Sequence, residues 1–499
     1  MGGFNIKNKT IIILFILLLL TIVSSVSASS NDTLTANDDS AVTDSVSHDE
    51  SAQKAIDNPS IKESKNLKTA SNKHNSKIKV ADATVTYSDK ALLKATIVDK
   101  TANKYITSGK VLFKINGVSI GYSNIEKGKA SMLYDTKNLT AKKYNISVVY
   151  GGSKSINGYR SNATLKVNKM PTVITLNNVN AKTNTSCVIT ALVKDKKGAK
   201  VNGGFVLFKV NGLSLSQVKV VNGVASLKYT PLNVVRNYTI TAKYSGTSRY
   251  AYSSRDSKLL VTLKVGVLNW ASKGNIKANT VLYRNLTKSS ITNDLVNAAL
   301  SGTPYVCLGN GKGNVVFIVS GIHGSELSSQ SACVKLINDL STKNLHGTVY
   351  IIPFVAPSYT GNNTRNLNNV NLNSVANKKG TISNNVYNLA KSKKAVSLGD
   401  FHCTQPGGEP GRDAVFGTSK PTAASATLAK YIAGKTGSSA IVYAKAGSEY
   451  QGALEDYCNM HSLTSVTCEV KTAHGSIAKG SVEKSYKMMK SFLAYYKII

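Results

Sequence analysis

The spacing of apolar and polar residues changes several times along the chain. An unbroken apolar run covers residues 11–23. Between residues 79 and 264, apolar and polar positions alternate in short segments bounded by Gly, Asn and Ser, as in β-strands. From residue 302 onward, short apolar runs are separated by longer segments with helical spacing. The pattern predicts a multidomain protein with an all-β part followed by an α/β part.

The N-terminal apolar run is typical of an export signal. Lys7 and Lys9 precede it, it is shorter than the ~20 residues of a membrane span, and Val26-Ser27-Ala28 offers small residues for cleavage. We expect a signal peptide over residues 1–28, an extracellular or cell-surface location, and no transmembrane span beyond this segment. An uncleaved anchor is the alternative interpretation. Residues 29–78 are polar and nearly free of aromatic side chains, which predicts a disordered stalk.

The alternating part contains an internal repeat. The sequence VLFKINGVS at residues 111–119 returns as VLFKVNGLS at residues 206–214. Short strands joined by Asn-Gly turns predict two β-sandwiches, over residues 79–168 and 169–264. This half resembles the Ig-like repeats of bacterial and archaeal adhesin-like surface proteins. No group of polar residues recurs in both copies, so we expect spacers; a specific ligand site is the alternative.

The second half alternates strands with helices, which predicts an α/β domain with a mainly parallel sheet over residues 302–499. In such a sheet the functional site lies at the carboxyl ends of the strands. Residues 265–301, which contain the single tryptophan, are interpreted as a linker or lead-in to this domain. A small wall-binding element is the alternative for that segment.

Candidate metal ligands follow two of the predicted strands. His323 and Glu326 stand in a Gly-flanked loop after the apolar run 315–320, and His402 closes a second run in the sequence Asp-Phe-His. Two imidazoles and one carboxylate suit Zn²⁺ and leave a fourth position for water. Asp400, two residues before His402 on an extended segment, points to the same side and is predicted to orient a ligand. Chance turn chemistry is the alternative origin of the first motif.

Residues 302–496 resemble the zinc carboxypeptidase superfamily, in its compact branch with succinylglutamate desuccinylase and aspartoacylase. The resemblance implies one Zn²⁺ per chain, held by His323, Glu326 and His402. Five segments in the same order carry it: GIHGSE at 321–326, VNLN at 370–373, DFH at 400–402, IVYAKAGS at 441–448 and SVTCEV at 465–470.

The resemblance also implies catalytic roles. Glu469 would accept a proton from the attacking water and return it to the leaving nitrogen. Arg365, one of two arginines after residue 300, would stabilise the developing oxyanion. A surface carboxylate at a strand end is the alternative for Glu469.

Three further residues are candidate substrate-binding groups. Asn373 belongs to the VNLN segment, and Tyr443 corresponds to the family's tyrosine-bearing loop, with a core position as its alternative. Arg412 and the Gly-rich run 405–411 are expected to shape a substrate loop. The remaining histidines of this half are interpreted as loop or solvent-facing residues: His346, His461 and His474.

One position departs from the family pattern. Many members have an arginine after the VDLN segment that grips the terminal carboxylate of the substrate, and this chain has Ser374 there. The choice between exopeptidase and internal cleavage therefore stays open, as does hydrolysis of small N-acyl amino acids. Arg412 or a lysine is a candidate replacement for the lost charge.

The net charge of +36 on 499 residues is carried mainly by lysine and favours polyanionic partners such as wall polymers or anionic headgroups. A solvated basic surface matched to its habitat is the alternative interpretation. Nucleic acid is not an expected partner, because the basic residues lack aromatic interleaving and no binding motif occurs. Six cysteines form no disulfide framework. A pair such as Cys458 with Cys468 is one alternative, and six free thiols in a reducing habitat are the other.

Together these features predict a secreted or surface-attached zinc-dependent hydrolase that cleaves peptide, isopeptide or other amide bonds, with cell-wall peptides as a candidate substrate. An N-acyl amino acid deacylase is the alternative among enzymes. A non-catalytic adhesin-like surface protein is the alternative from another class.

Overall fold

The computed structural model describes residues 72–231, 233–366 and 369–499. The predicted signal peptide, and the predicted stalk up to residue 71, lie outside the described residues. Among the described residues, no helix has both the length and the apolar character needed to cross a membrane.

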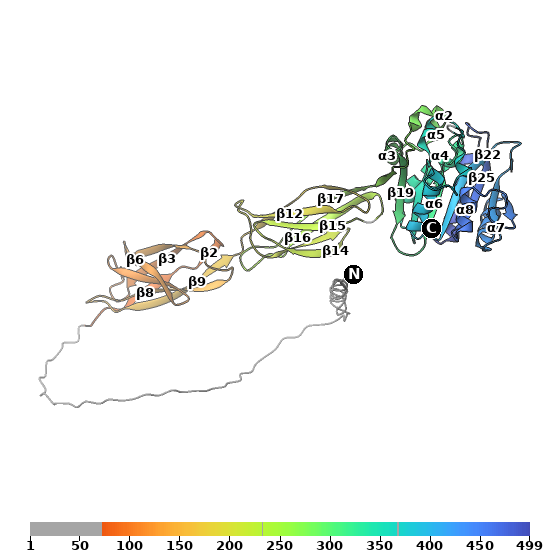
Figure 1. Cartoon of the computed structure of the whole chain (residues 1–499). Coiled ribbons are helices and arrows are strands. Elements are labelled where there is room, and N and C mark those ends of the chain that lie inside the picture. Colours follow the sequence, from red (N-terminus) through yellow and green to blue (C-terminus); the bar gives the residue numbers. More distant parts are fainter. Residues whose placement is uncertain (1–71, 232, 367–368) are drawn as a thin grey trace, which may run out of the picture. The chain divides into compact units, whose positions relative to one another are not determined.

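The first repeat is a sandwich of two sheets (Figure 1). One sheet contains β1 (Ser76–Val80), β3 (Lys90–Asp99), β4 (Lys104–Tyr105) and β7 (Lys129–Asp135). The other has the order β2-β9-β8-β5-β6: β2 (Ala83–Thr86), β9 (Tyr159–Asn168), β8 (Lys143–Tyr150), β5 (Lys110–Ile115) and β6 (Val118–Asn124). Alternate residues of both sheets are buried between them, Leu93 and Phe113 completely, so the period of two places one apolar face of each sheet inward.

The second repeat has a similar arrangement. Its smaller sheet contains β10 (Thr172–Leu176), β12 (Cys187–Asp195) and β15 (Val224–Tyr229). The larger sheet has the order β11-β17-β16-β13-β14: β11 (Val179–Lys182), β17 (Ser253–Thr262), β16 (Arg236–Tyr244), β13 (Phe205–Val210) and β14 (Leu213–Lys219).

Equivalent hairpins in the two repeats close with the predicted Asn-Gly turns. Asn116 and Gly117 have φ angles of 48° and 85°, and Asn211 and Gly212 have 45° and 82°. Two successive residues with positive φ form the turn whose twist matches that of paired strands. Asn and Gly adopt this conformation most readily, so the turns explain why the pair recurs.

The α/β domain is built on one sheet of eight strands. Their order is β18 (Val265–Leu268), β19 (Thr303–Gly309), β21 (Thr348–Ile352), β20 (Val315–Ser320), β22 (Ser397–Thr404), β25 (Thr464–Lys471), β23 (Ala414–Thr418) and β24 (Ser439–Tyr443). The four central strands, β21, β20, β22 and β25, are parallel. The pairings β18–β19, β19–β21 and β23–β25 are antiparallel. The edge pair β23–β24 is also parallel, but both strands run opposite to the four central ones. The sheet is therefore mixed, which the sequence did not show because apolar runs carry no information on strand direction.

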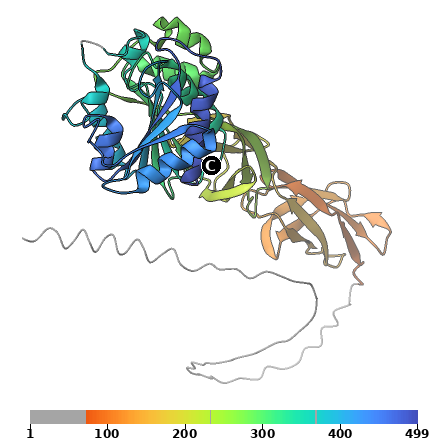
Figure 2. The same ribbon diagram turned by 90° about the vertical axis from the view of Figure 1, so that its right-hand side faces the viewer.

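Helices cover both faces of this sheet (Figure 2). One apolar core contains residues from α2 (Thr280–Asn285), α3 (Ser290–Ala299), α4 (Leu327–Ser341), α7 (Ala424–Thr436) and α9 (Ser481–Tyr495). The other contains residues from α5 (Pro357–Gly361), η2 (Leu372–Ser374), α6 (Ile382–Ser392) and α8 (Leu454–Met460). β20 contributes Val316 and Ile318 to the first core and Phe317 and Val319 to the second, which accounts for its unbroken apolar run.

Residues 265–301 belong to this domain in the structure. β18 pairs with β19 along Val265–Leu268, and Leu295 and Val296 of α3 lie in the same core as α4. A 3-10 turn, η1 (Ile276–Ala278), and α2 also lie in this segment. The sequence separated the segment as a lead-in because one strand of four residues gives too short an alternation to recognise.

Candidate metal centre

The loop between β20 and α4 holds the first two candidate ligands. β20 ends at Ser320 and α4 begins at Leu327, so His323 and Glu326 lie at the carboxyl end of a central strand. Gly324 allows this loop to approach α5: a Cβ atom at this position would lie 2.0 Å from the carbonyl carbon of Tyr359. Only glycine fits so close to another backbone.

A glutamine that the sequence analysis did not identify fixes the same loop. Gln330, on the first turns of α4, is fully buried. Its Nε2 donates to the carbonyls of Gly324 (3.0 Å) and Glu326 (3.1 Å), and its Oε1 accepts from Thr360 Oγ1 (2.8 Å). Because both carbonyls belong to the loop between β20 and α4, Gln330 fixes the loop that carries His323 and Glu326.

Strand register brings the other site residues together. In the parallel pair β22–β25, His402 is opposite Glu469, so both lie near the carboxyl ends of central strands. Phe401, Cys403 and Cys468 belong to the core under α4 and α9. Alternation therefore turns Asp400, His402 and Glu469 to the opposite face. Asp400 and His402 share a side, as their spacing of two predicts.

His323, Glu326 and His402 form a compact, buried group. Their ligand atoms all lie within 4.8 Å of one another, and each residue is only 1–2 % exposed. Glu326 Oε1 lies 2.7 Å from His323 Nδ1, and Oε2 lies 2.8 Å from His402 Nδ1. The three side chains therefore point at one place, with an Nδ1 atom from each imidazole.

The outer nitrogen of His323 has a partner that settles its role. Asn371 Oδ1 lies 2.8 Å from His323 Nε2 and also accepts from the backbone N–H of Asn373 (3.0 Å). Because the second contact requires the amide oxygen at that place, His323 Nε2 must be the donor. The ring is thereby oriented with Nδ1 toward Glu326, as an oriented metal ligand would be.

Asp400 supplies a charge beside the second imidazole. It is fully buried, and its Oδ2 lies 2.9 Å from His402 Nε2, an ion-pair distance without the alignment of a hydrogen bond. Neither carboxylate oxygen has a hydrogen-bond partner among the described residues. A buried carboxylate in that state requires a positive charge nearby. Protonated His402 supplies it in the metal-free chain, and a cation held by the Nδ1 atoms would supply it once bound, so the residues present fit a metal ion.

The electrostatics of the group follow from these contacts. Burial alone would raise the pKa of Glu326, but His323 and His402 hold it well below its usual range. Burial would lower the pKa of His402, yet Asp400 and Glu326 raise it well above its ordinary value. In the metal-free chain His402 therefore carries both ring protons, and binding of a cation at Nδ1 releases one of them.

Glu469 stands next to this group as a separate carboxyl. Its Oε2 is enclosed and has no hydrogen-bond partner among the described residues. Burial, followed by repulsion from Glu326, raises the pKa of Glu469 to about 8, although His402 and Arg365 act in the opposite direction. A carboxyl that gains and loses its proton near neutral pH is suited to general acid–base chemistry.

Arg365 contacts the same group from its exposed side. Its Nη1 donates to Glu326 Oε1 over 2.6 Å, and 42 % of its side chain is exposed, against 2 % for Glu326. The guanidinium therefore marks the direction from which the site is open.

The structure does not bring the other predicted substrate-binding residues into contact with the three ligands. Asn373 Oδ1 accepts from the backbone of Leu454 (3.1 Å). Arg412 Nε donates to Ser439 Oγ (3.2 Å) at an exposed place. Tyr443 stacks on Phe416 with 5.9 Å between ring centroids, on the edge strand β24. Their proposed roles remain predictions.

His474 lies at the site, although the sequence analysis interpreted it as a loop residue. Its Nε2 lies 3.0 Å from the carbonyl oxygen of Cys403 and 3.7 Å from Glu326 Oε1. The signal available in the sequence was its position, five residues after Glu469, in the loop that follows β25.

The structure does not form the candidate pair of Cys458 with Cys468, which the sequence left open. All six cysteines are free thiols. Cys458 lies in the core on the α8 side of the sheet, and Cys468 lies in the core under α4 and α9. The sheet separates the two side chains, so their closeness in sequence does not allow them to pair.

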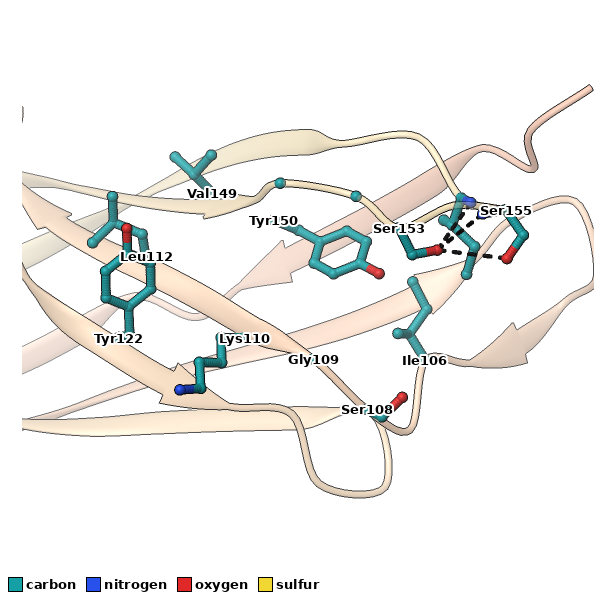
Figure 3. Close-up of a pocket in the computed structure, with 13 residues that line it drawn as sticks. Ile106, Ser108, Gly109, Lys110, Leu112, Tyr122, Val149, Tyr150, Ser153 and Ser155 are labelled. Carbon is teal, nitrogen blue, oxygen red and sulfur yellow. Dashed lines mark hydrogen bonds between the residues drawn. The ribbon is translucent and has the colours of Figure 1, made fainter. Parts of the chain in front are cut away.

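The first repeat contains a hollow of about 500 Å³ that shares no residue with the candidate metal centre (Figure 3). Ser153 Oγ, on its wall, accepts from the backbone N–H groups of Ser155 (3.3 Å) and Ile156 (3.1 Å). The residues that line it include no carboxylate, imidazole or thiol.

Comparison with known proteins gives matches to separate parts of the chain. Residues 174–265 match the family of bacterial Ig-like domains (group 3), which confirms the Ig-like prediction for the second repeat. No curated protein matches the chain.

Solved structures similar to this chain include hydrolases. A succinylglutamate desuccinylase from a Silicibacter species is 16% identical, with 40% of this chain and 63% of that chain covered and a TM-score of 0.34. The murein-tripeptide amidase of Escherichia coli O157 is 17% identical, with 40% and 89% covered and a TM-score of 0.30. The fibronectin(III)-like modules of Clostridium thermocellum CbhA are 18% identical, with 38% and 95% covered and a TM-score of 0.18. The chain thus spans less than two thirds of the desuccinylase, and these values are too low to assign an activity.

Proposed function

We propose that this chain is a Zn²⁺-dependent hydrolase of amide bonds that acts at a cell surface. The observation that carries the proposal is the buried group of His323, Glu326 and His402, whose ligand atoms lie within 4.8 Å of one another. Asp400, buried and otherwise unpartnered beside His402, supports a cation at this place. The match to a bacterial Ig-like domain is consistent with a surface or extracellular location.

The metal would be held by His323, Glu326 and His402. Bound there, Zn²⁺ supplies a Lewis acid and lowers the pKa of a water molecule toward ~7. Glu326 stays ionised, because two imidazoles and the Arg365 guanidinium contact it. Cys403 N–H donates to Glu326 Oε2 over 3.0 Å and fixes the orientation of the carboxylate.

Glu469 would move the proton. The pKa of its carboxyl is about 8 in the metal-free chain, and a cation held by the three ligands would lower that pKa. The ionised carboxylate could then take a proton from the attacking water and return it to the leaving nitrogen. Arg365, half-exposed and attached to Glu326 through one nitrogen, can present its remaining donors to the oxygen that becomes negative. Glu469 and Arg365 would thus both lie beside the carbonyl group of the bound substrate.

The proposed substrate is a peptide or isopeptide that is cleaved at an internal bond, at a distance from its terminal carboxylate. Wall peptides are the first class to test. Ser374 donates its hydroxyl to the carbonyl of Asn371 (2.9 Å) and offers no charge for a terminal carboxylate. A Cβ on Gly452 would lie 2.1 Å from the Ser374 carbonyl oxygen, so this stretch is closely packed. The net charge of +36 favours an anionic surface as partner.

Hydrolysis by the purified, zinc-loaded full chain tests the proposal. Wall peptides, isopeptides and N-acyl amino acids are incubated with it, and released amines are measured by mass spectrometry. Glu469→Gln should lower the rate by roughly 10²–10⁴-fold while zinc stays bound. Glu483→Gln is the matched control, because Glu483 is exposed and pairs with Lys335.

Cleavage of N-acyl amino acids alone would identify a deacylase instead. A zinc-loaded chain that cleaves none of the three substrate classes would favour the adhesin-like alternative. A Glu469→Gln variant as fast as wild type would remove Glu469 from the mechanism.

A further inference from the structure

Strand β22 extends beyond the end of its neighbour β20. On that side, the backbone groups at the end of β22 bond to side chains. β20 ends at Ser320, which pairs with Phe401, so Cys403 lies beyond the ladder on that side. The N–H of Cys403 donates to Glu326 Oε2 (3.0 Å), and its carbonyl lies 3.0 Å from His474 Nε2. Glu326 and His474 thus take the place of the missing strand.

The chemistry of the carbonyl fixes the role of the imidazole. A carbonyl oxygen only accepts, so His474 Nε2 carries a hydrogen and donates it to Cys403. Cys403 is 1 % exposed, and a buried carbonyl without a partner is costly. His474 therefore satisfies a group that the strand ladder leaves unpaired.

The loop that carries His474 is itself attached to the ligand loop. The N–H of Gly475 donates to the carbonyl of Ser325 over 2.7 Å, and Asn363 Nδ2 donates to the carbonyl of Gly475 over 3.3 Å. Thr472 Oγ1 accepts from the N–H of Ala478 (3.0 Å), within the same loop. The imidazole is thus held in place by its backbone.

His474 also lies on the open side of the ligand carboxylate. Cys403 N–H and His402 contact Glu326 Oε2, whereas His323 Nδ1 (2.7 Å), Arg365 Nη1 (2.6 Å) and His474 Nε2 (3.7 Å) face Oε1. The side chain of His474 is 21 % exposed, against 2 % for Glu326. His474 thus bonds to the residue whose N–H donates to Glu326, and it also lies near Oε1 of the same carboxylate.

We propose that His474 is a positioning residue of the metal centre: by donating to the Cys403 carbonyl it fixes the residue whose backbone N–H donates to Glu326, and so sets how tightly the metal is retained. The inference rests on the proposed metal centre. Groups that orient metal ligands through hydrogen bonds typically change metal affinity by about 10–100-fold.

The test is a zinc affinity measured by competition with a chromogenic chelator, on the purified full chain stripped of metal. His474→Ala should weaken zinc binding by about 10–100-fold. His474→Gln should retain more affinity than His474→Ala, because its amide N–H can still donate to Cys403. Thr472→Val, which removes only a bond within the loop, should bind zinc as wild type does.

Thermal unfolding of the metal-free variants separates positioning from general damage. His474→Gln and Thr472→Val should unfold within a few degrees of wild type, and the rise in unfolding temperature on adding zinc should be smaller for the His474 variants. An unchanged zinc affinity in His474→Ala, or an equal loss of affinity in Thr472→Val, would overturn the proposed role of His474. Either result would leave the metal centre itself in place. A wild-type chain that binds no zinc would overturn the metal centre as well.

Discussion

A buried carboxyl group outside the proposed metal centre shows what single residues contribute to this fold. Glu455 on α8 is 5 % exposed, and its Oε1 accepts from Asn459 Nδ2 over 2.5 Å. Burial, and then the neighbouring Asp456, raise the pKa of Glu455 well above its usual range. The carboxyl therefore stays protonated in the folded chain and has a hydrogen to donate to Asp456.

This residue makes stability depend on pH in a defined direction. Folding raises the pKa of this acid above its ordinary value of 4.5. Its contribution to the stability of the folded state is therefore lost as the pH rises from 4.5 toward the pKa of the folded chain. Glu455→Gln removes this loss and keeps the contact with Asn459. Its unfolding temperature should therefore exceed that of wild type at pH 8 and match it at pH 4. Equal pH profiles for the two proteins would contradict the protonated state, and the exposed Glu483→Gln is the control.

Among single residues, those that belong to a sequence motif could be predicted. Those whose role depends on a contact made in the folded chain could not. His323, Glu326 and His402 could be predicted as metal ligands because metal chemistry limits both residue type and spacing, and the structure brings their side chains together. Gln330 and His474 act on carbonyls that are distant along the chain or come close only after folding. No local pattern encodes such contacts.

At the scale of elements, the loop between β20 and α4 depends on one glycine. A Cβ at Gly324 would overlap the backbone of Tyr359 at 2.0 Å, so Gly324→Ala must displace either α5 or the ligand loop. We expect a loss of about 1–3 kcal/mol in unfolding free energy and weaker zinc binding, measured by thermal unfolding and chelator competition.

The control is Gly434→Ala on α7, where nothing lies within 4 Å of an added Cβ. In a helix, that change should stabilise by about 0.5–1 kcal/mol. A Gly324→Ala variant that is as stable as wild type and binds zinc equally would show that the close approach is unimportant.

The hairpin turn of the first repeat allows a similar comparison. Gly117 has φ of 85° with free space around it, whereas Gly151 has equally free space without a positive φ. Gly117→Ala should cost about 1–2 kcal/mol, because a side chain disfavours that conformation, and Gly151→Ala should cost little. Amide hydrogen exchange of β5 and β6 measures the difference. Equal exchange in both variants would contradict a strained turn.

Elements with a strong local signal were predictable, and others were not. The strands of the repeats follow from alternation and from the two Asn-Gly turns. β18 was missed because it has four residues and pairs with a strand more than thirty positions later, at Thr303–Val306. The antiparallel outer strands were missed because direction follows from the path of the chain, which periodicity does not show.

At the scale of the whole molecule, the chain combines two β-sandwiches with an α/β domain that carries all the candidate catalytic groups. The hollow in the first repeat has no such groups among its lining residues. We propose a separate role for each part of the chain. The repeats would act as spacers at a surface, and the basic charge would favour an anionic environment. The α/β domain would carry out the hydrolysis.

The metal content of the purified full chain tests the central claim most directly. The chain is prepared without added metal and analysed by mass spectrometry beside His323→Ala and His402→Ala, with His461→Ala as control because His461 is exposed and bonds only to the Tyr457 carbonyl among the described residues. We expect about one zinc ion per chain in wild type and in the control, and none in the two ligand variants. A folded wild-type chain that holds no zinc, even after zinc is supplied, would contradict it.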